Sequence, residues 1–117
     1  MEKKSILIDY DKEEDIISLF KEGSKSKVSF DLDLPNGNIV VDYDFNGRIV
    51  GLEFFNASNY FPLLKKVSDL KNLKASFSVK YSQNWVQINY FIYLPNIDQP
   101  ISSFINVPYN KELILAH

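Results

Sequence analysis

The sequence of 117 residues contains no cysteine, a single arginine and a single histidine. Without cysteine, the chain has no disulfide, no thiolate nucleophile and no zinc or iron–sulfur site built on thiolates. The histidine is the last residue, His117, a position that is usually mobile, which argues against a Ser-His-Asp triad. The motifs GxGxxG, GxxxxGK[ST] and GxSxG are also absent. These absences favour a protein that is not an enzyme.

Long apolar runs are missing too, since the longest contain only a few residues. A helix that crosses a membrane needs about 20 consecutive apolar residues, so no membrane span is expected. Residues 9–15 (DYDKEED) are acidic where a signal peptide needs apolar residues, and we expect a cytoplasmic protein. With 45% hydrophobic and 24% charged residues, the composition is that of a folded chain, and the length suits one domain over residues 1–117.

Charge is distributed unequally along the chain. Residues 1–60 carry seven basic and twelve acidic side chains, a net charge of -5, whereas residues 61–117 carry six basic and three acidic side chains, a net charge of +3. Such an asymmetry can steer two parts of one chain, or two subunits, towards each other. The alternative is that the lysines of the second half solvate a surface.

Short runs rich in β-branched and aromatic residues, separated by polar turns, predict antiparallel strands in the first half of the chain. Two strands are expected at Ser5–Tyr10 and Asp15–Lys21. A meander of three strands is expected at Val28–Leu34, Ile39–Phe45 and Arg48–Phe55.

An Asn-Gly pair separates the strands of the meander twice, at residues 36–37 and 46–47. Asn-Gly is typical of two-residue type I′ turns. With both pairs as two-residue loops, Val41 lies opposite Leu32 on one side and Leu52 on the other, and one face of the meander is almost wholly apolar. Because a one-residue slip would turn every side chain to the other face, the agreement of the two hairpins supports this register.

Residues 59–73 (NYFPLLKKVSDLKNL) have apolar residues at helical spacing and predict the main helix. Ser58 or Asn59 suits its N-cap, and Pro62 falls in the first turn, where a missing N–H does little harm. We expect this helix to cover the apolar face of the meander.

The chain then returns to β structure. Strands are expected at Ala75–Tyr81 and Trp85–Leu94, with an edge strand near Ser103–Val107. The predicted fold class is therefore α+β, with an antiparallel sheet of about five to seven strands and one main helix packed on it.

Two stretches, IDYDKEEDIISLF (residues 8–20) and NIVVDYDFNGRIVGLEFFNAS (residues 38–58), resemble domain-of-unknown-function family 2283. The resemblance covers residues 6–58, and its most specific parts are VDYD, NGRIVGLE and NAS. It implies a small α+β domain, with residues 6–58 as its β-meander part. Residues 59–117, which depart from the short family members, add the helix and the C-terminal hairpin expected from their own residue pattern. It implies no activity, and an antitoxin-like role only by association, because some members are encoded beside ribonuclease-like toxins.

The second face of the meander is acidic. The predicted register puts Asp31 directly opposite Asp42, with Asp44 on the same face, and opposed like charges destabilise a sheet. A divalent cation would compensate, since Ca²⁺, Mg²⁺ and Mn²⁺ prefer carboxylate oxygens, and it would support a metal-dependent or small-molecule-binding enzyme. A basic protein surface would also compensate, whereas on an exposed face water screens the charges. No loop has calcium-ligand spacing, so the sequence favours no metal and no other cofactor.

A nucleic-acid surface is a further hypothesis. Its candidate residues combine lysines with aromatic side chains: Lys65, Lys66, Lys71, Lys74, Lys80, Tyr81 and Trp85. Lysine beside aromatic rings is typical of single-strand binding. The single arginine and the isoelectric point of about 5.3 argue against it.

Residues 85–94 (WVQINYFIYL) alternate between an apolar face and a face that carries Trp85, Phe91 and Tyr93. A single helix cannot cover both faces of a sheet, so these three aromatic residues are interface candidates, with burial in the chain's own core as the alternative. We expect a homodimer that buries at least two of them in a two-fold contact.

The sequence as a whole favours a non-enzymatic protein-interaction module that acts as a homo-oligomer or as the acidic partner of a basic protein. The alternative is an enzyme that uses the acidic face. No membrane partner and no nucleic acid are expected.

Overall fold

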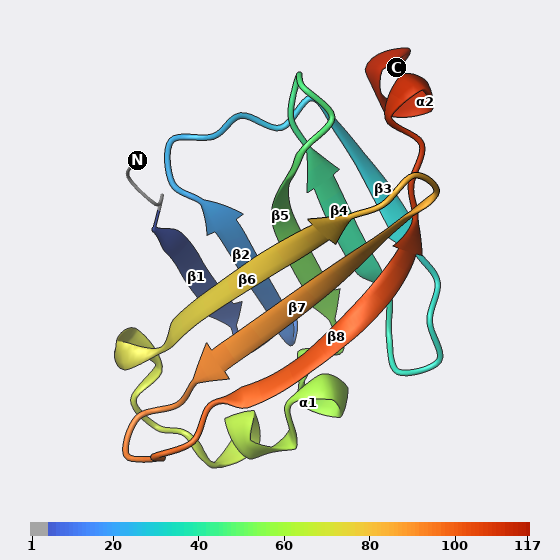
Figure 1. Ribbon diagram of the computed structural model, residues 1–117. Coiled ribbons are helices and arrows are strands. Elements are labelled where there is room, and N and C mark those ends of the chain that lie inside the picture. The colour runs from blue at the N-terminus through green and yellow to red at the C-terminus, as the bar shows by residue number, and fades with distance from the viewer. Residues whose placement is uncertain (1–4) are drawn as a thin grey trace.

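The computed structural model describes residues 5–117, which form two antiparallel β-sheets packed face to face (Figure 1). The first sheet has five strands in the order β1-β2-β5-β4-β3, and the second sheet has three in the order β6-β7-β8. The strands of the first sheet are β1 (Ile6–Asp11), β2 (Ile16–Lys21), β3 (Val28–Leu32), β4 (Ile39–Tyr43) and β5 (Ile49–Phe55). Those of the second sheet are β6 (Lys74–Tyr81), β7 (Trp85–Tyr93) and β8 (Ile101–Pro108). Residues 1–4, at the start of the chain where a signal peptide was considered, lie outside the described residues.

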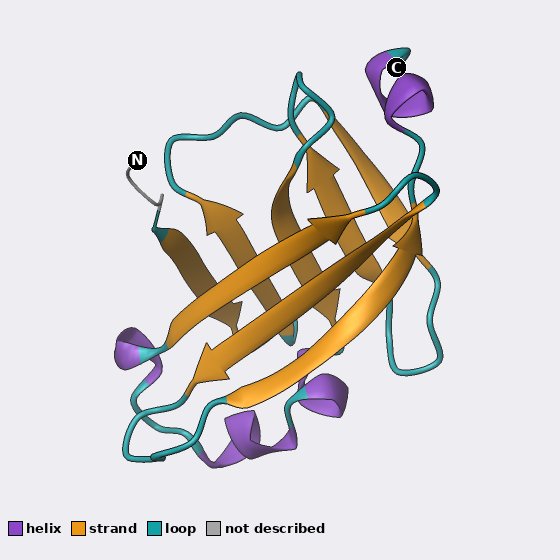
Figure 2. Cartoon of the chain, in the orientation of Figure 1, coloured by secondary structure: helices purple, strands orange, loops and turns teal. Residues whose placement is uncertain are grey.

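The helical segments are short and lie outside the two sheets (Figure 2). They are α1 (Ala57–Tyr60), the 3₁₀ helices η1 (Pro62–Lys66) and η2 (Leu70–Asn72), and α2 (Lys111–Leu115). Within residues 5–117, no helix is long and apolar enough to cross a membrane.

The prediction of one main helix over residues 59–73 is wrong. Phe61 interrupts it with φ -131° and ψ 74°, because the residue before a proline is disfavoured in the helical region and Pro62 follows. The chain becomes extended again at Val67, with φ -89° and ψ 121°. The apolar residues do recur at helical spacing, but the segment forms only short, separate helical turns.

The second sheet, rather than a helix, covers the apolar face of the first. Leu52 of β5 and Ile88 of β7 are fully buried, and the rings of Phe54 and Tyr90 meet across the layers with centroids 4.9 Å apart. Burying a large apolar side chain contributes about 1.5–3 kcal/mol, so this layer of side chains holds the two sheets together. The antiparallel sheet is confirmed, but the protein is more β-rich than the predicted α+β fold with one main helix.

The pairing of β4 with β5 agrees with the predicted register over most of its length. Val41 lies opposite Leu52, as expected. The register then shifts at a bulge, and Tyr43 lies opposite Ile49 instead of Val50, its partner in the predicted register. A bulge of this kind bends the strand and increases its twist.

Neither Asn-Gly pair forms a type I′ turn, which needs positive φ at both loop residues. Of the four residues in these two pairs, only the glycines have positive φ, at +135° for Gly37 and +74° for Gly47. In the β4–β5 hairpin, the N–H of Asp44 donates to the carbonyl of Arg48 at 2.8 Å, which leaves a three-residue loop closed by the glycine. This is the common alternative of a type I turn followed by a left-handed residue.

The β3–β4 hairpin has a longer loop than predicted, and its register is displaced by two residues. Leu32 lies opposite Ile39 instead of Val41. Because side chains alternate with a period of two, an even displacement leaves every residue on its predicted face. The apolar face is therefore confirmed, but the predicted opposition of Asp31 and Asp42 is wrong.

The sandwich is closed on one side and open on the other. β1 lies against β6, whereas β3 and β8 are the edge strands on the opposite side (Figure 1). Side chains from both edges line cavities there.

Candidate functional site

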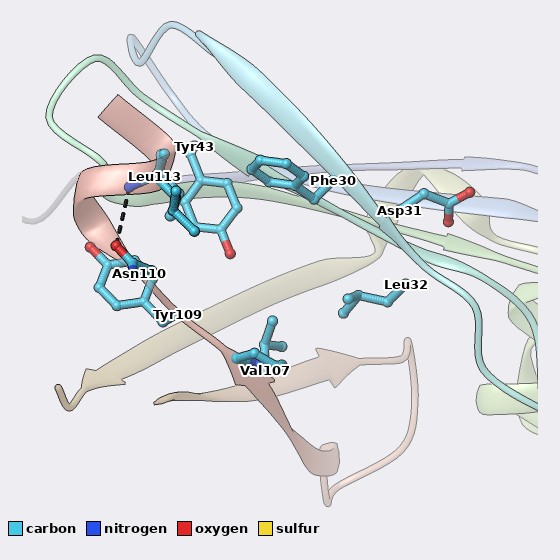
Figure 3. Close-up of a pocket in the computed structure, with 10 residues that line it drawn as sticks. Phe30, Asp31, Leu32, Tyr43, Val107, Tyr109, Asn110 and Leu113 are labelled. Atoms are coloured by element: carbon cyan, nitrogen blue, oxygen red, sulfur yellow. Dashed lines mark hydrogen bonds between the residues drawn. The ribbon is translucent and has the colours of Figure 1, made fainter. Parts of the chain in front are cut away.

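A cavity of about 380 Å³ lies on the open side, between β3, the end of β8 and α2 (Figure 3). Its lining is mainly apolar and consists of Phe30, Asp31, Leu32, Tyr43, Val107, Pro108, Tyr109, Asn110, Leu113 and Ile114. Sequence reasoning missed this cavity because its walls come from segments far apart in the chain. The one signal in the sequence was an apolar run, LIL at residues 113–115, after the expected edge strand.

Tyr43 is the polar group at the centre of this cavity. The residue is only 2% exposed, and its hydroxyl points into the space between Phe30, Leu32 and Val107 (Figure 3). Burial, together with the nearby Tyr109, raises the pKa of Tyr43 to about 12. The hydroxyl is therefore protonated at neutral pH and available as a hydrogen-bond donor.

Two hydrogen bonds tie α2 and Tyr109, which precedes it, to other parts of the chain. The Tyr109 hydroxyl donates to the carbonyl of Gly47 at 2.7 Å. The Lys27 ammonium donates to the carbonyl of Leu115 at 2.6 Å. The cavity wall is thus fixed to the β4–β5 hairpin on one side and to the start of β3 on the other.

His117, the last residue of the chain, lies beside α2. Its Nδ1 is 2.7 Å from the carbonyl oxygen of Leu113, and its ring meets the ring of Phe30 edge-on, with centroids 5.2 Å apart. The residue packs against the edge of the first sheet.

The outer face of the second sheet, which we call the aromatic face, carries all three predicted interface residues. Trp85 is 54% exposed, Tyr93 is 43% exposed and Phe91 is half-buried. The alternative of burial in the core is therefore wrong for Trp85 and Tyr93. Phe104 of β8, also 54% exposed, lies on the same face and was missed by the sequence analysis. Its signal was the alternation along the expected edge strand, where Phe104 falls between inward-facing residues.

The centre of the aromatic face is uncharged. Its polar residues are Ser76, Ser78, Gln87, Asn89, Ser102 and Asn106. Lys74 and Lys80 lie on the same face of the edge strand β6, opposite Tyr93 and Gln87. The other lysines of the predicted nucleic-acid surface lie elsewhere, on η1 and η2. Tyr81, a further candidate, has its ring beneath the guanidinium of Arg48, 4.5 Å away.

The acidic residues do face outward on the first sheet, but their partners differ from those predicted. Asp31 lies opposite Val40, and Ser29 lies opposite Asp42. The Ser29 hydroxyl donates to the Asp42 carboxylate, and the Asn38 amide donates to Asp31 at 3.1 Å. The two carboxylates therefore have separate donors, and the repulsion expected from the predicted register is avoided.

Asp44 stabilises the β4–β5 hairpin. One of its carboxylate oxygens accepts from the N–H of Asn46 at 2.8 Å and from the N–H of Arg48 at 2.9 Å. On the same sheet, burial and the charge of Asp42 raise the pKa of Glu53. Within the described part of the chain, no group of three or more histidine or acidic side chains is arranged to hold a metal ion.

The sequence is similar to known proteins in both halves of the chain. A family model described as protein of unknown function (DUF2283) matches residues 7–58. The chain is also 41% identical over 90 residues to the uncharacterized protein MJ0789 of Methanocaldococcus jannaschii, covering 76% of this chain and 73% of the relative. The chain belongs to the DUF2283 family. No solved structure matches it. Because the alignment with the relative is much longer than the DUF2283 match, the likeness continues past residue 58 into the second half.

The structure explains how the two motifs of the DUF2283 segment fit together. Asp15, at the turn between β1 and β2, has a left-handed φ of 57°. Its carboxylate accepts from the N–H of Ser58 at 3.0 Å and from the Ser58 hydroxyl at 2.7 Å. The Tyr10 hydroxyl also donates to it, at 2.7 Å. This cluster of Tyr10, Asp15 and Ser58 joins the acidic turn between β1 and β2 to the NAS sequence at residues 56–58.

The same cluster replaces the predicted helix cap. Neither Ser58 nor Asn59 is the N-cap residue of α1; that position is Asn56, in the left-handed region with φ 54° and no side-chain hydrogen bond. Asp15, which lies outside the helix, accepts hydrogen bonds from two N–H groups at its start. Its carboxylate accepts from Ser58, and its carbonyl accepts from Ala57 at 2.8 Å. These DUF2283 motif residues therefore have a structural role in this chain.

Proposed function

We propose that this DUF2283 protein is a non-enzymatic interaction module that forms a homodimer through the aromatic face. The observation that carries the proposal is the exposure of three large aromatic side chains, Trp85, Tyr93 and Phe104, on one side of one sheet. Single exposed apolar residues are ordinary on a protein surface, but several large ones on one face of one sheet favour an interaction site.

The composition of the face supports a second copy of the chain as its occupant. Aromatic residues surround uncharged polar side chains, and charge is confined to Lys74 and Lys80 on one edge strand. About a two-fold axis parallel to β7, the β6 edge of each copy lies over the β8 edge of the other, so the lysines of the two copies are kept apart. Exposed aromatic residues, a centre without charge and charge confined to the rim are typical of protein interfaces.

Trp85 allows a direct test because it is the only tryptophan in the chain. Sedimentation equilibrium is expected to show a concentration-dependent dimer, and the tryptophan emission is expected to shift to shorter wavelength over the same concentration range. Trp85→Ala is expected to weaken dimerisation by about 2 kcal/mol or more, roughly 30-fold, as at an interface hot spot. Because the contact is mainly apolar, salt is expected to change the dissociation constant little.

Phe45→Ala is the matched control. Phe45 is 64% exposed but lies at the tip of the β4–β5 hairpin, outside the aromatic face. Its replacement removes a similar apolar area and is expected to leave dimerisation unchanged. A monomer at high micromolar concentration, or equal effects of the two substitutions, would refute the proposal, and binding of a single-stranded oligonucleotide that quenches Trp85 would assign the face to nucleic acid instead.

The outer face of the first sheet favours a second candidate, the acidic partner of a basic protein. Its strands turn Asp9, Asp31, Asp42 and Glu53 outward, which agrees with the antitoxin-like association of the family. Neutralising Asp9, Asp42 and Glu53 to the corresponding amides is expected to abolish binding to a lysine-rich polypeptide. The control is an equal neutralisation of exposed acidic residues off this face, at positions 13, 14 and 22. If both sets weaken binding equally, the attraction is only net charge, and this candidate is refuted.

A further inference from the structure

The cavity between β3, β8 and α2 has the dimensions of a small-molecule site. Its volume of about 380 Å³ lies in the range of about 300–1,000 Å³ that ligand pockets occupy. An apolar protein cavity of about 150 Å³ is enough to hold benzene. This cavity therefore has room for a molecule of one or two rings with a short substituent.

The hydroxyl of Tyr43 gives the cavity one polar contact. Among residues 5–117, this hydroxyl has no hydrogen-bond partner, although the residue as a whole is almost completely buried. Because every fully buried side-chain nitrogen or oxygen in those residues has a partner, the hydroxyl oxygen itself is accessible from the cavity. The neighbouring Tyr109 hydroxyl, in contrast, is used by the carbonyl of Gly47. The Tyr43 hydroxyl points into the cavity (Figure 3), where water or a ligand can accept its hydrogen bond.

The charge of the lining limits the ligand. None of the residues that line the cavity is basic, and its one acidic residue, Asp31, directs its carboxylate away from the cavity (Figure 3). A charged ligand would lose its hydration there without gaining an ion pair. A neutral molecule avoids this loss.

We propose that this cavity binds a neutral, mainly apolar small molecule whose carbonyl or ether oxygen accepts a hydrogen bond from Tyr43. The ring or chain of the ligand packs against Phe30, Leu32 and Val107, and Leu113 of α2 lies at the side of the site. This inference is independent of the proposed dimer, because the aromatic face is on the opposite surface of the second sheet.

Three probes of one size separate the contributions. Acetophenone carries a carbonyl acceptor, α-methylstyrene has a CH₂ group in place of that oxygen, and benzoate carries a negative charge. Amide chemical shifts of the ¹⁵N-labelled full chain are followed by NMR during each titration. Acetophenone is expected to bind with a dissociation constant of the order of 1 mM, as for a ligand of this size. At equal concentration, α-methylstyrene is expected to bind several-fold more weakly, and benzoate is expected not to bind.

Tyr43→Phe removes the hydroxyl and keeps the ring. In this variant, acetophenone is expected to lose its advantage over α-methylstyrene, while the apolar part of the binding remains. The shifted amides are expected to cluster at Leu32, Val107 and Leu113, and not at Gln87 and Asn89 of the aromatic face. The proposal is overturned by shifts confined to the aromatic face, by no saturable binding of acetophenone up to about 20 mM, or by an unchanged preference in the variant.

Discussion

Asp15→Asn isolates the role of the carboxylate that joins the two motifs of the family segment. Asparagine has the same shape and, like aspartate, tolerates the left-handed φ of 57° found at this position. The substitution therefore leaves the backbone unstrained and removes only the negative charge and one acceptor oxygen. Asp15→Ala would also add backbone strain, because alanine disfavours the left-handed φ at this position.

The hydrogen bonds of the carboxylate set the magnitude of the effect. It accepts from Ser58 N–H, Ser58 Oγ and Tyr10 Oη, at 3.0, 2.7 and 2.7 Å. A hydrogen bond to a charged group contributes about 1.5–3 kcal/mol when buried. Since the three bonds share one partly exposed carboxylate and do not add, the expected loss for Asp15→Asn is about 2 kcal/mol. A chain of this size would then melt roughly 8–10 °C lower.

The pH dependence follows from the same contacts. Partial burial by itself raises the pKa of Asp15, but the hydrogen bonds from Ser58 and Tyr10 outweigh it and lower the pKa. A folded pKa below the unfolded value of about 3.9 means that the stabilisation is fully present above that value. It is lost as the pH falls through the lower folded pKa. The wild-type chain is therefore expected to lose more stability than Asp15→Asn between neutral pH and pH 2.

Urea denaturation followed by circular dichroism, at pH 7 and at acidic pH, measures both effects. Asp9→Asn is the control, because Asp9 is an exposed aspartate on the neighbouring strand β1. The control is expected to change the free energy of unfolding by no more than about 0.5 kcal/mol. Equal stability of the two variants at pH 7, or equal slopes with pH, would show that the Asp15 cluster does not stabilise the fold.

Two glycines give further predictions that the same denaturation assay checks. Gly37→Ala is expected to cost about 3 kcal/mol or more, because φ is +135° and a Cβ would lie 2.2 Å from the carbonyl oxygen of Phe55; a loss below about 1 kcal/mol would contradict the close approach. Gly47→Val is expected to cost about 1–3 kcal/mol, because a β-branched residue resists the φ of +74°. Gly47→Asn is expected to cost much less, and equal losses for the two substitutions would show that φ is not what limits this turn.

The strands could be predicted from the sequence because alternation is a local property. In residues 85–94 every second side chain is apolar, and the structure buries those residues and turns Trp85 and Tyr93 outward. The register was less accessible because it depends on loop length. Asn36-Gly37 fits a two-residue loop as a dipeptide, but Gly37 is used for a close approach to Phe55, and the loop is longer as a result.

The prediction of the main helix was wrong for a different reason. The apolar spacing over residues 59–73 is helical, but one local conformational conflict prevents a continuous helix. Leu64 is fully buried at its helical spacing, but the Phe61-Pro62 step prevents one continuous helix. The aromatic face was predicted because it follows from one strand. The cavity around Tyr43 was not, because its walls come from β3, β4, β8 and α2, and no pattern in a single segment shows that they meet.

The DUF2283 segment does not form a complete hydrophobic core by itself. Residues 7–58 build the first sheet and the Asp15 cluster, but the inner face of that sheet is apolar and needs a cover. In this chain the cover is the second sheet, and Leu52 and Phe54 belong to one buried cluster with Ile88 and Tyr90. The likeness to the archaeal relative runs past residue 58, as expected if the covering half is inherited together with the sheet it covers. The two candidate sites divide along this structure: the aromatic face belongs to the covering sheet alone, whereas the Tyr43 cavity exists only where the two sheets meet.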